Sequence, residues 1–184
     1  MTEHNYMNNG YVIKKDDGLD EIIQIPYNIN NKLATEQDII NILANQSVKI
    51  NKINHITYFN EAFTHKSYCL KNIIPDDILR KAKDEINNNN LLDLRKNSYE
   101  RWEYLGDRVI KLIVSFYLFR RYPDQDEGFM TRLQTKIEDK VNLAIMSKEL
   151  NLGKHFIISN QIEQLNGRNL EKINEDVFEA FFGA

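Results

Sequence analysis

The fold of this chain is decided by one run of acidic and apolar residues, Glu100-Arg101-Trp102-Glu103-Tyr104-Leu105-Gly106-Asp107. A helix turns by roughly 100° per residue, so Glu103 and Asp107 project from one face, and Glu100 joins the same stripe. The surrounding residues are apolar and predict a buried helix: Trp102, Tyr104, Leu105, Val109, Ile110, Leu112, Ile113 and Val114. Carboxylates in such a helix are costly unless a cation neutralises them.

A second acidic run near the C-terminus has the same character, Glu175-Asp176-Val177-Phe178-Glu179-Ala180. Asp176 and Glu179 are three residues apart and share one helix face. If the two helices touch, their carboxylates repel one another unless some take up protons or a hard cation binds. Oxygen-only ligands favour Mg²⁺ or Mn²⁺ over Zn²⁺, and an open site of this kind suits hydrolysis of a phosphodiester.

The alternative is that these acids form ordinary solvated helix faces, paired with lysine or arginine. Two features favour the metal site over that interpretation. There are two such runs, and both interrupt apolar stretches, the second being flanked by Ile173, Phe181 and Phe182.

These residues also carry a family resemblance. The segment Tyr99–Asp107 resembles the signature of the ribonuclease III family, which reads Glu-Arg-Leu-Glu-Phe-Leu-Gly-Asp. Five more family-like motifs follow the family's order: Ala62–Tyr68, Arg121–Pro123 with Asp126–Gly128, Thr131–Leu133, Gly167–Asn169 and Asp176–Ala180. The resemblance extends from about Glu36 to Ala184.

The resemblance implies an all-α fold, that of the ribonuclease III endonuclease domain, expected to form a symmetric dimer. In the family, the aromatic residue of the signature enters a pocket of the partner, and Tyr104 is the matching residue. The alternative is that Tyr104 is a core aromatic of the monomer. In the expected symmetric dimer, two active sites would flank one valley that holds an RNA duplex.

The resemblance also implies the site. Glu103, Asp107, Asp176 and Glu179 correspond to the family's metal ligands, with Asp107 and Glu179 as the catalytic pair. Mg²⁺ is the expected cofactor, and Mn²⁺ can substitute for it. The implied activity is hydrolysis of double-stranded RNA to 5′-phosphate and 3′-hydroxyl ends during RNA processing.

Four further residues receive lesser roles. Glu100 and Glu127 match acidic positions and are expected to support the site, although Glu127 equally suits the first turn of a helix capped by Asp126. Arg168 is a candidate for contacting RNA phosphates. His65, between Thr64 and Lys66, is expected to be a structural hydrogen-bonding residue.

Two other functions remain open at this stage. A catalytically silent family member would act as an RNA-binding or scaffold subunit, but such members are expected to have lost metal carboxylates. All four principal positions are acidic here, which favours the enzyme. A metal nuclease directed at DNA is the third hypothesis.

The predicted organisation is an N-terminal extension over residues 1–34, partly disordered with one strand near Glu21–Ile25, and an endonuclease domain over 35–184. Residues 70–97 form an insertion that is atypical of the family, with a short helix after Pro75. Family domains continue beyond the segment that ends at Ala184, and many carry a double-stranded-RNA-binding domain. We therefore expect either a fragment or a short form.

Several helix ends can be predicted. Thr35 and Asp38 form a potential capping box, and Thr57 and Ser98 are candidate caps for the next helix and for the signature helix. The signature helix should continue through Phe119, covered on several sides, before Pro123 stops it. The last helix is expected over Asn174–Gly183.

Composition sets the remaining bounds. The 184 residues carry a formal charge of −3, which argues against a broad basic surface for nucleic acid. The single cysteine, Cys69, excludes an internal disulfide and fits a reducing compartment. The sequence shows neither a signal-peptide pattern nor an apolar run of membrane-spanning length. We expect a soluble, intracellular and cytoplasmic protein that binds double-stranded RNA and a second copy of itself, without a membrane.

Overall fold

The structure is a computed structural model that describes residues 6–7, 10–14, 20–70 and 74–184. The strands are β1 (Tyr6–Met7), β2 (Gly10–Lys14) and β3 (Asp20–Gln24). The α-helices are α1 (Glu36–Asn45), α2 (Ile56–Ala62), α3 (Asp76–Ile86), α4 (Glu100–Arg121), α5 (Glu127–Ile137), α6 (Lys140–Glu149), α7 (Asn160–Gln164) and α8 (Glu171–Gly183). Short 3-10 turns are η1 (Lys66–Tyr68), η2 (Leu152–His155) and η3 (Gly167–Asn169). The body is helical, as predicted.

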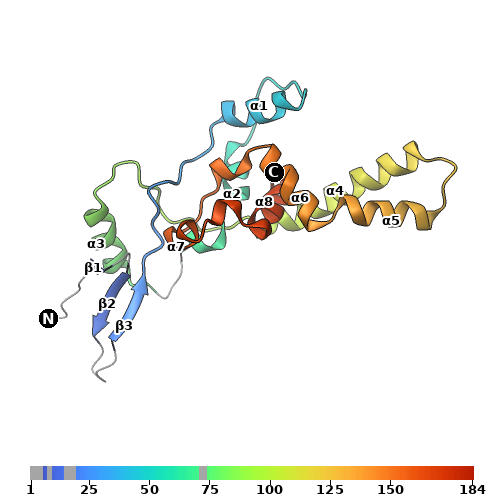
Figure 1. Ribbon diagram of the computed structural model, residues 1–184. Helices are drawn as coiled ribbons and strands as arrows, with labels where there is room; N and C mark the ends of the chain where they lie inside the picture. The colour runs from blue at the N-terminus through green and yellow to red at the C-terminus, as the bar shows by residue number, and fades with distance from the viewer. Residues whose placement is uncertain (1–5, 8–9, 15–19, 71–73) are drawn as a thin grey trace.

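Helix α8 lies at the centre of the body, and α4, α6 and α2 pack around it (Figure 1). Its buried side chains include Ile173, Val177, Phe178 and Phe181, which join residues of α1, α2, α4 and α6 in one hydrophobic core. The long signature helix α4 was expected to be the covered, central helix. That prediction is wrong for its distal half.

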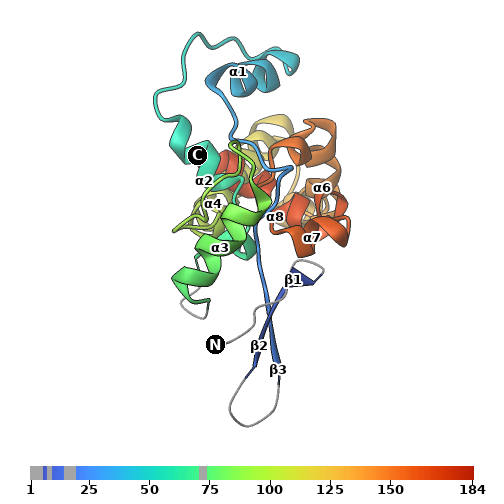
Figure 2. The ribbon, with the colours of Figure 1, turned by 90° about the vertical axis from the view of Figure 1, so that its left-hand side faces the viewer.

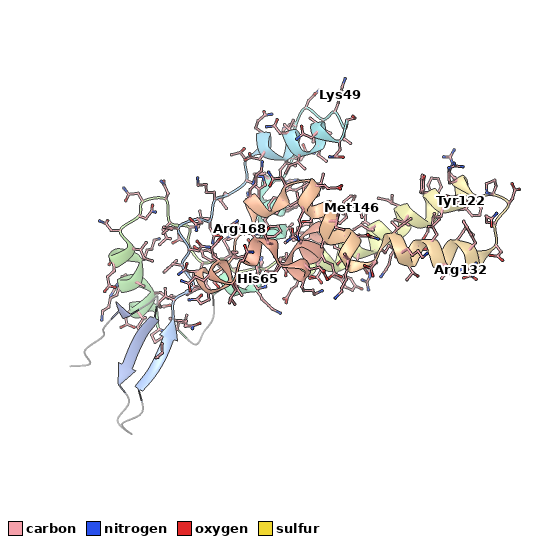
Figure 3. The ribbon with its side chains drawn as sticks, in the orientation of Figure 1. Lys49, His65, Tyr122, Arg132, Met146 and Arg168 are labelled. Atoms are coloured by element: carbon pink, nitrogen blue, oxygen red, sulfur yellow. The ribbon has the colours of Figure 1, made fainter. Side chains whose placement is uncertain are left out.

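The distal half of α4 projects from the body together with α5, as Tyr122 and Arg132 show in Figure 3. Leu112, Phe116 and Phe119 expose 70%, 60% and 69% of their surface. The reason is that α5 is the element that pairs with α4 on the hairpin, and α5 buries none of its own residues. A large apolar surface is therefore open on the hairpin.

Two glycines allow α4 and α8 to cross in close contact. A Cβ placed on Gly106 would lie 1.7 Å from the backbone oxygen of Glu179, and one on Gly183 would lie 2.3 Å from that of Trp102. No side chain fits at either point. The crossing therefore depends on the absence of a Cβ, and it brings the acidic run of α4 against that of α8.

The N-terminal extension contains the predicted strand, which the structure places at Asp20–Gln24, and two strands that were not predicted. They form an antiparallel sheet in the order β1-β2-β3, with Tyr11 opposite Ile23. Part of the extension that was predicted to be disordered, residues 1–5, 8–9 and 15–19, lies outside the described residues.

The extension packs on the insertion. Ile25, just after β3, is buried with Ile78 and Ala82 of α3 in a second, smaller core. Figures 1 and 2 show α3 and the sheet at the same end of the molecule, away from the α4–α5 hairpin. The N-terminal extension and the insertion that is atypical of the family thus stabilise each other.

The extension is also joined to the body before the predicted boundary at residue 34. Asn28, Asn31 and Ala34 are all buried. Asn31 exchanges two hydrogen bonds with the backbone of Ile158, at 2.8 and 3.2 Å. The boundary therefore falls inside a packed segment.

The predicted caps had mixed outcomes. Thr35 and Asp38 form the capping box of α1, and Asp126 accepts a hydrogen bond from the Phe129 N–H at the start of α5. The candidate Thr57 is wrong, because α2 begins after His55, which makes no side-chain cap. Ser98 does contribute at the start of α4, where its hydroxyl accepts a hydrogen bond from the Glu100 N–H at 3.5 Å.

The last helix begins at Glu171, three residues earlier than predicted, and the preceding loop contains η2, α7 and η3. Across the described ranges, no helix is both long and apolar enough to cross a membrane.

We expect Gly106→Ala to lower the free energy of unfolding by about 3 kcal/mol, the upper range for overpacking, because a methyl group would force α4 and α8 apart. Gly128→Ala is the control, since its Cβ would meet side-chain atoms and no backbone, the end of the Arg132 side chain at 3.2 Å and Oδ1 of Asp126 at 3.5 Å. Urea unfolding measures both. Equal stabilities of the two variants would contradict the close crossing.

Candidate metal centre

Four carboxylates come from the two crossing helices. Glu103 and Asp107 stand one turn apart on α4, and Asp176 and Glu179 stand nearly one turn apart on α8. Asp176 is only 5% exposed, and the other three side chains are partly buried. The spacing within each helix and the glycine contact between the helices together bring these acids to one region.

The charges in this region oppose one another. Burial raises the pKa of Glu103 to about 7, and the nearby charge of Asp176 adds to that effect. Burial likewise raises the pKa of Glu179 to about 7, with the charge of Asp107 as the next cause. Carboxyls from both helices therefore lie within one another's field, with more negative charge than the site can readily hold.

Three cations relieve part of this charge. Lys111 lies 2.8 Å from a carboxylate oxygen of Asp107, which Arg108 also contacts. Lys172 lies 2.6 Å from Oδ1 of Asp176. Arg108 therefore turns toward a predicted ligand, where it competes with any ion that binds Asp107.

The oxygen donors suit a hard divalent cation, which would relieve the crowding that raises the pKa values of Glu103 and Glu179. Within the described residues, however, no group of three or more histidine, cysteine or acidic side chains is gathered closely enough to hold a metal. The side chains pair with lysine and arginine in this conformation. The donor set fits Mg²⁺ or Mn²⁺, and binding requires Asp107 and Asp176 to exchange those partners.

The two supporting acids differ in their distance from this centre. Glu100 lies close enough for its charge to add to the rise in the pKa of Glu103. Glu100 is exposed and lies 3.5 Å from Lys66. Glu127 begins α5 at the far end of the hairpin, where its carboxylate accepts a hydrogen bond from Thr131. One chain therefore does not bring Glu127 to the four carboxylates, and its position in the first turn of α5 agrees with the structural alternative.

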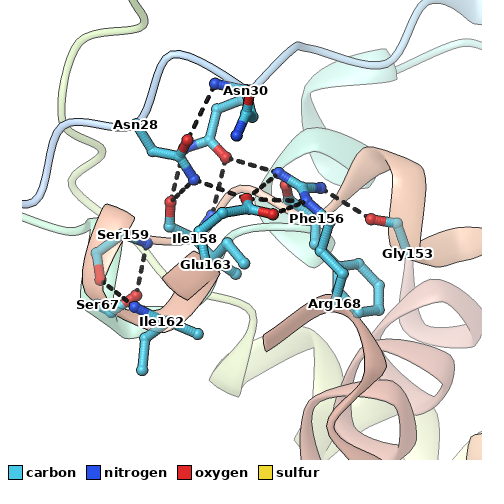
Figure 4. A network of polar contacts seen from close by, with 11 residues as sticks. Asn28, Asn30, Ser67, Gly153, Phe156, Ile158, Ser159, Ile162, Glu163 and Arg168 are labelled. Atoms are coloured by element: carbon cyan, nitrogen blue, oxygen red, sulfur yellow. Dashed lines mark hydrogen bonds and ion pairs between the residues drawn. The ribbon is translucent and has the colours of Figure 1, made fainter. Parts of the chain in front are cut away.

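Arg168 has a structural role instead of the predicted RNA contact. Its guanidinium donates to the Glu163 carboxylate, to the backbone oxygens of Gly153 and Phe156, and to Asn31. Figure 4 shows this network, in which Asn28 also donates to Glu163. These contacts engage all three guanidinium nitrogens, and the side chain is largely buried, so Arg168 is not available to phosphates.

His65 accepts a hydrogen bond from the Ser67 N–H through Nδ1, as expected of a structural histidine. Tyr104 is 66% exposed, so the alternative of a core aromatic is wrong.

Three residues of the site were missed in the sequence. Gly106 permits the helix crossing, Lys172 pairs with Asp176, and the Tyr99 hydroxyl donates to Asp176 Oδ2 at 2.8 Å. A glycine within a helix and a lysine four residues before an aspartate were visible signals. The Tyr99 contact joins residues 77 positions apart and had no local signal.

Known proteins share these features. Residues 100–184 match the sequence profile of the Ribonuclease III domain. A probable ribonuclease 3 of Acanthamoeba polyphaga mimivirus is 36% identical over 159 residues, which are 86% of this chain and 28% of that protein. A ribonuclease 3 of Lactobacillus acidophilus is 37% identical over 133 residues, 72% of this chain and 50% of that protein. The chain thus spans half or less of these two relatives.

The fold is shared with a solved nuclease domain of ribonuclease III from Campylobacter jejuni, with a TM-score of 0.59 and 24% identity. The alignment covers 79% of this chain and 82% of that one. Fold and site together define a helical domain of the ribonuclease III type, whose acids lie on two crossing helices. The chain belongs to the ribonuclease III family.

The raised pKa of Glu103 predicts how metal-free stability depends on pH. The folded state holds this proton more tightly than the unfolded state, so stability falls as pH rises from about 4.5 through about 7. We expect Glu103→Gln, which cannot ionise, to become progressively more stable than the unmodified protein between pH 5 and 8.

Thermal unfolding in EDTA measures this difference. Glu171→Gln, an exposed acid on α8, is the control and should show no such trend. A constant difference between Glu103→Gln and the unmodified protein would contradict the crowding of carboxylates.

Proposed function

We propose that this chain is a Mg²⁺-dependent endoribonuclease that cleaves double-stranded RNA. One observation carries the proposal. Four carboxylates oppose one another across a helix crossing that leaves no room for a side chain, and two of them have pKa values raised to about 7. Such an arrangement is costly without a bound cation, so its persistence in the fold favours a metal-dependent reaction.

The roles follow from position. Glu103, Asp107, Asp176 and Glu179 would hold the ion, with Asp107 and Glu179 nearest to the chemistry. When bound, Mg²⁺ supplies an activated water and stabilises charge on the phosphate oxygens. The rigid α4–α8 pair holds the ligands in place, so that the scissile phosphate meets a fixed geometry. The expected products carry 5′-phosphate and 3′-hydroxyl ends, with short 3′ overhangs.

The proposed substrate class is duplex RNA. Proteins recognise duplex RNA mainly by its shape, its 2′-hydroxyls and its phosphates, so little sequence preference is expected. Because the net charge is −3, the protein as a whole does not attract the RNA phosphates. Affinity for RNA would therefore come from a local surface and from the bound ion.

We propose a symmetric homodimer that uses the exposed apolar side of α4. The side chains concerned are Tyr104, Leu105, Leu112, Ile113, Phe116, Tyr117 and Phe119. Beside Tyr104 lies a hollow of about 570 Å³, whose walls include Trp102 and Leu105. A two-fold interface pairs one surface with itself, so a protruding aromatic and an adjacent hollow can serve both partners. The Campylobacter structure was described for flexibility in its region involved in dimer formation.

The alternative is a catalytically silent RNA-binding or scaffold subunit. The pairing of Asp107 with Lys111 and Arg108 is the observation that favours it, because these cations occupy a ligand. The presence of all four carboxylates favours the enzyme.

We expect Glu179→Gln to abolish Mg²⁺-dependent cleavage of a long RNA duplex while binding is retained. Loss of several kcal/mol of transition-state stabilisation corresponds to a rate at least about a thousandfold lower. Denaturing gels measure cleavage, and gel shifts in Ca²⁺ measure binding. Glu171→Gln, on the same helix but exposed, is the matched control and should cleave normally.

If the unmodified dimer binds duplex RNA in Mg²⁺ without cleaving it, the enzyme hypothesis is contradicted and the scaffold hypothesis is supported. Cleavage of duplex DNA under the same conditions would redirect the proposal to a DNA nuclease.

We expect Tyr104→Ala to weaken the homodimer, because it removes a 66% exposed aromatic from the proposed interface. Sedimentation velocity should show about a tenfold higher dissociation constant, within the range for an interface aromatic. Ile22→Ala is the control, since Ile22 is 67% exposed but lies on β3, away from α4. Equal dissociation constants would exclude Tyr104 from the interface.

A further inference from the structure

Tyr99 joins the start of α4 to the buried acid of α8. It is 4% exposed and precedes the first residue of α4. Its hydroxyl donates to Oδ2 of Asp176 at 2.8 Å, and Asp176 is itself 5% exposed. A buried hydrogen bond to a charged acceptor is among the stronger side-chain contacts.

The position of this hydroxyl is fixed by the fold. The Tyr99 backbone N–H donates to the Thr64 oxygen at 2.8 Å, and the ring belongs to the main hydrophobic core. The ring also packs against His65, with 5.7 Å between centroids. Tyr99 therefore cannot follow Asp176 if that carboxylate rotates.

The second oxygen of Asp176 has a different environment. Oδ1 lies 2.6 Å from Nζ of Lys172, whose side chain is 70% exposed. When this lysine leaves, its ammonium regains water, and the remaining cost is the uncompensated charge of the buried Asp176, which an ion arriving at Oδ1 would neutralise. Asp176 thus has one oxygen held by a rigid, buried donor and one held by a mobile, exchangeable cation.

We propose that Tyr99 is a positioning residue of the metal centre. It holds Asp176 through Oδ2, so that Oδ1 is presented to the divalent ion when Lys172 moves away. Asp176 then binds the ion through a single oxygen. This inference rests on the proposed metal-dependent function and adds a residue to it. Partners that orient metal ligands typically change affinity by ten- to a hundredfold when removed.

The test compares two tyrosine-to-phenylalanine variants. Tyr99→Phe keeps the ring and removes the donor to Asp176. Tyr68→Phe is the matched control, because Tyr68 is also fully buried and its hydroxyl donates 2.7 Å to the Leu92 oxygen, away from the four carboxylates. Mn²⁺ titration followed by electron paramagnetic resonance measures affinity without any need for turnover.

We expect Tyr99→Phe to bind Mn²⁺ about tenfold more weakly, and Tyr68→Phe to bind within twofold of the unmodified protein. In cleavage assays, Tyr99→Phe should raise the Mg²⁺ concentration for half-maximal rate by a similar factor and leave the rate at saturating Mg²⁺ nearly unchanged. A purely structural role would lower melting temperature in both variants without this separation.

Unchanged Mn²⁺ affinity in Tyr99→Phe, or equal loss in both variants, would overturn the role of Tyr99 and leave the metal centre intact. Failure of the unmodified protein to bind Mn²⁺ would overturn the metal centre, and this inference with it. If Tyr99→Phe does not fold, a crystal of the unmodified protein soaked in Mn²⁺ decides. Oδ2 of Asp176 should stay bonded to Tyr99 while Oδ1 contacts Mn²⁺, and the opposite arrangement would refute the proposal.

Discussion

The close approach of α4 and α8 at Gly106 and Gly183 is the constraint on which the site depends. The backbone oxygen of Glu179 lies where a Cβ on Gly106 would stand, so the two helices approach one another at this point more closely than any side chain would allow. The carboxylates on each side of this contact must then face their counterparts. The raised pKa values of Glu103 and Glu179 follow from burial at this crossing and from the charges of the acids on the other helix.

The sequence predicted the helical body and the four acids because both depend on local spacing. Three- and four-residue intervals determine a helix face, and the capping box at Thr35 is a contact between near neighbours. The exposure of the distal part of α4 was not predictable in this way. An apolar circumference indicates that a helix is covered, but it does not distinguish cover by the same chain from cover by another.

The remaining misses concern contacts between distant parts of the chain. Arg168 appears in the sequence as a basic residue in a loop with a glycine, which suits phosphate binding. Its actual partners include Asn31, which is 137 positions away, and two backbone oxygens. Likewise, no periodicity links Ile25 to α3, yet they share a core. When a side chain forms hydrogen bonds with buried groups of a remote segment, the residues around it in the sequence show no pattern that predicts the contact.

The N-terminal segment around Asn28 and Asn31 sets an order of events during synthesis. Its hydrogen-bond partners Ile158 and Glu163 lie 127 to 135 residues further along the chain. These asparagines emerge from the ribosome early and remain without their native partners until the last fifth of the sequence has followed. Contacts of such long range slow folding, because the chain loses entropy in closing the loop before it gains the bonds. The loop before α8 therefore folds late. Helix α8, which carries Asp176 and Glu179, reaches its final position only after that loop has folded.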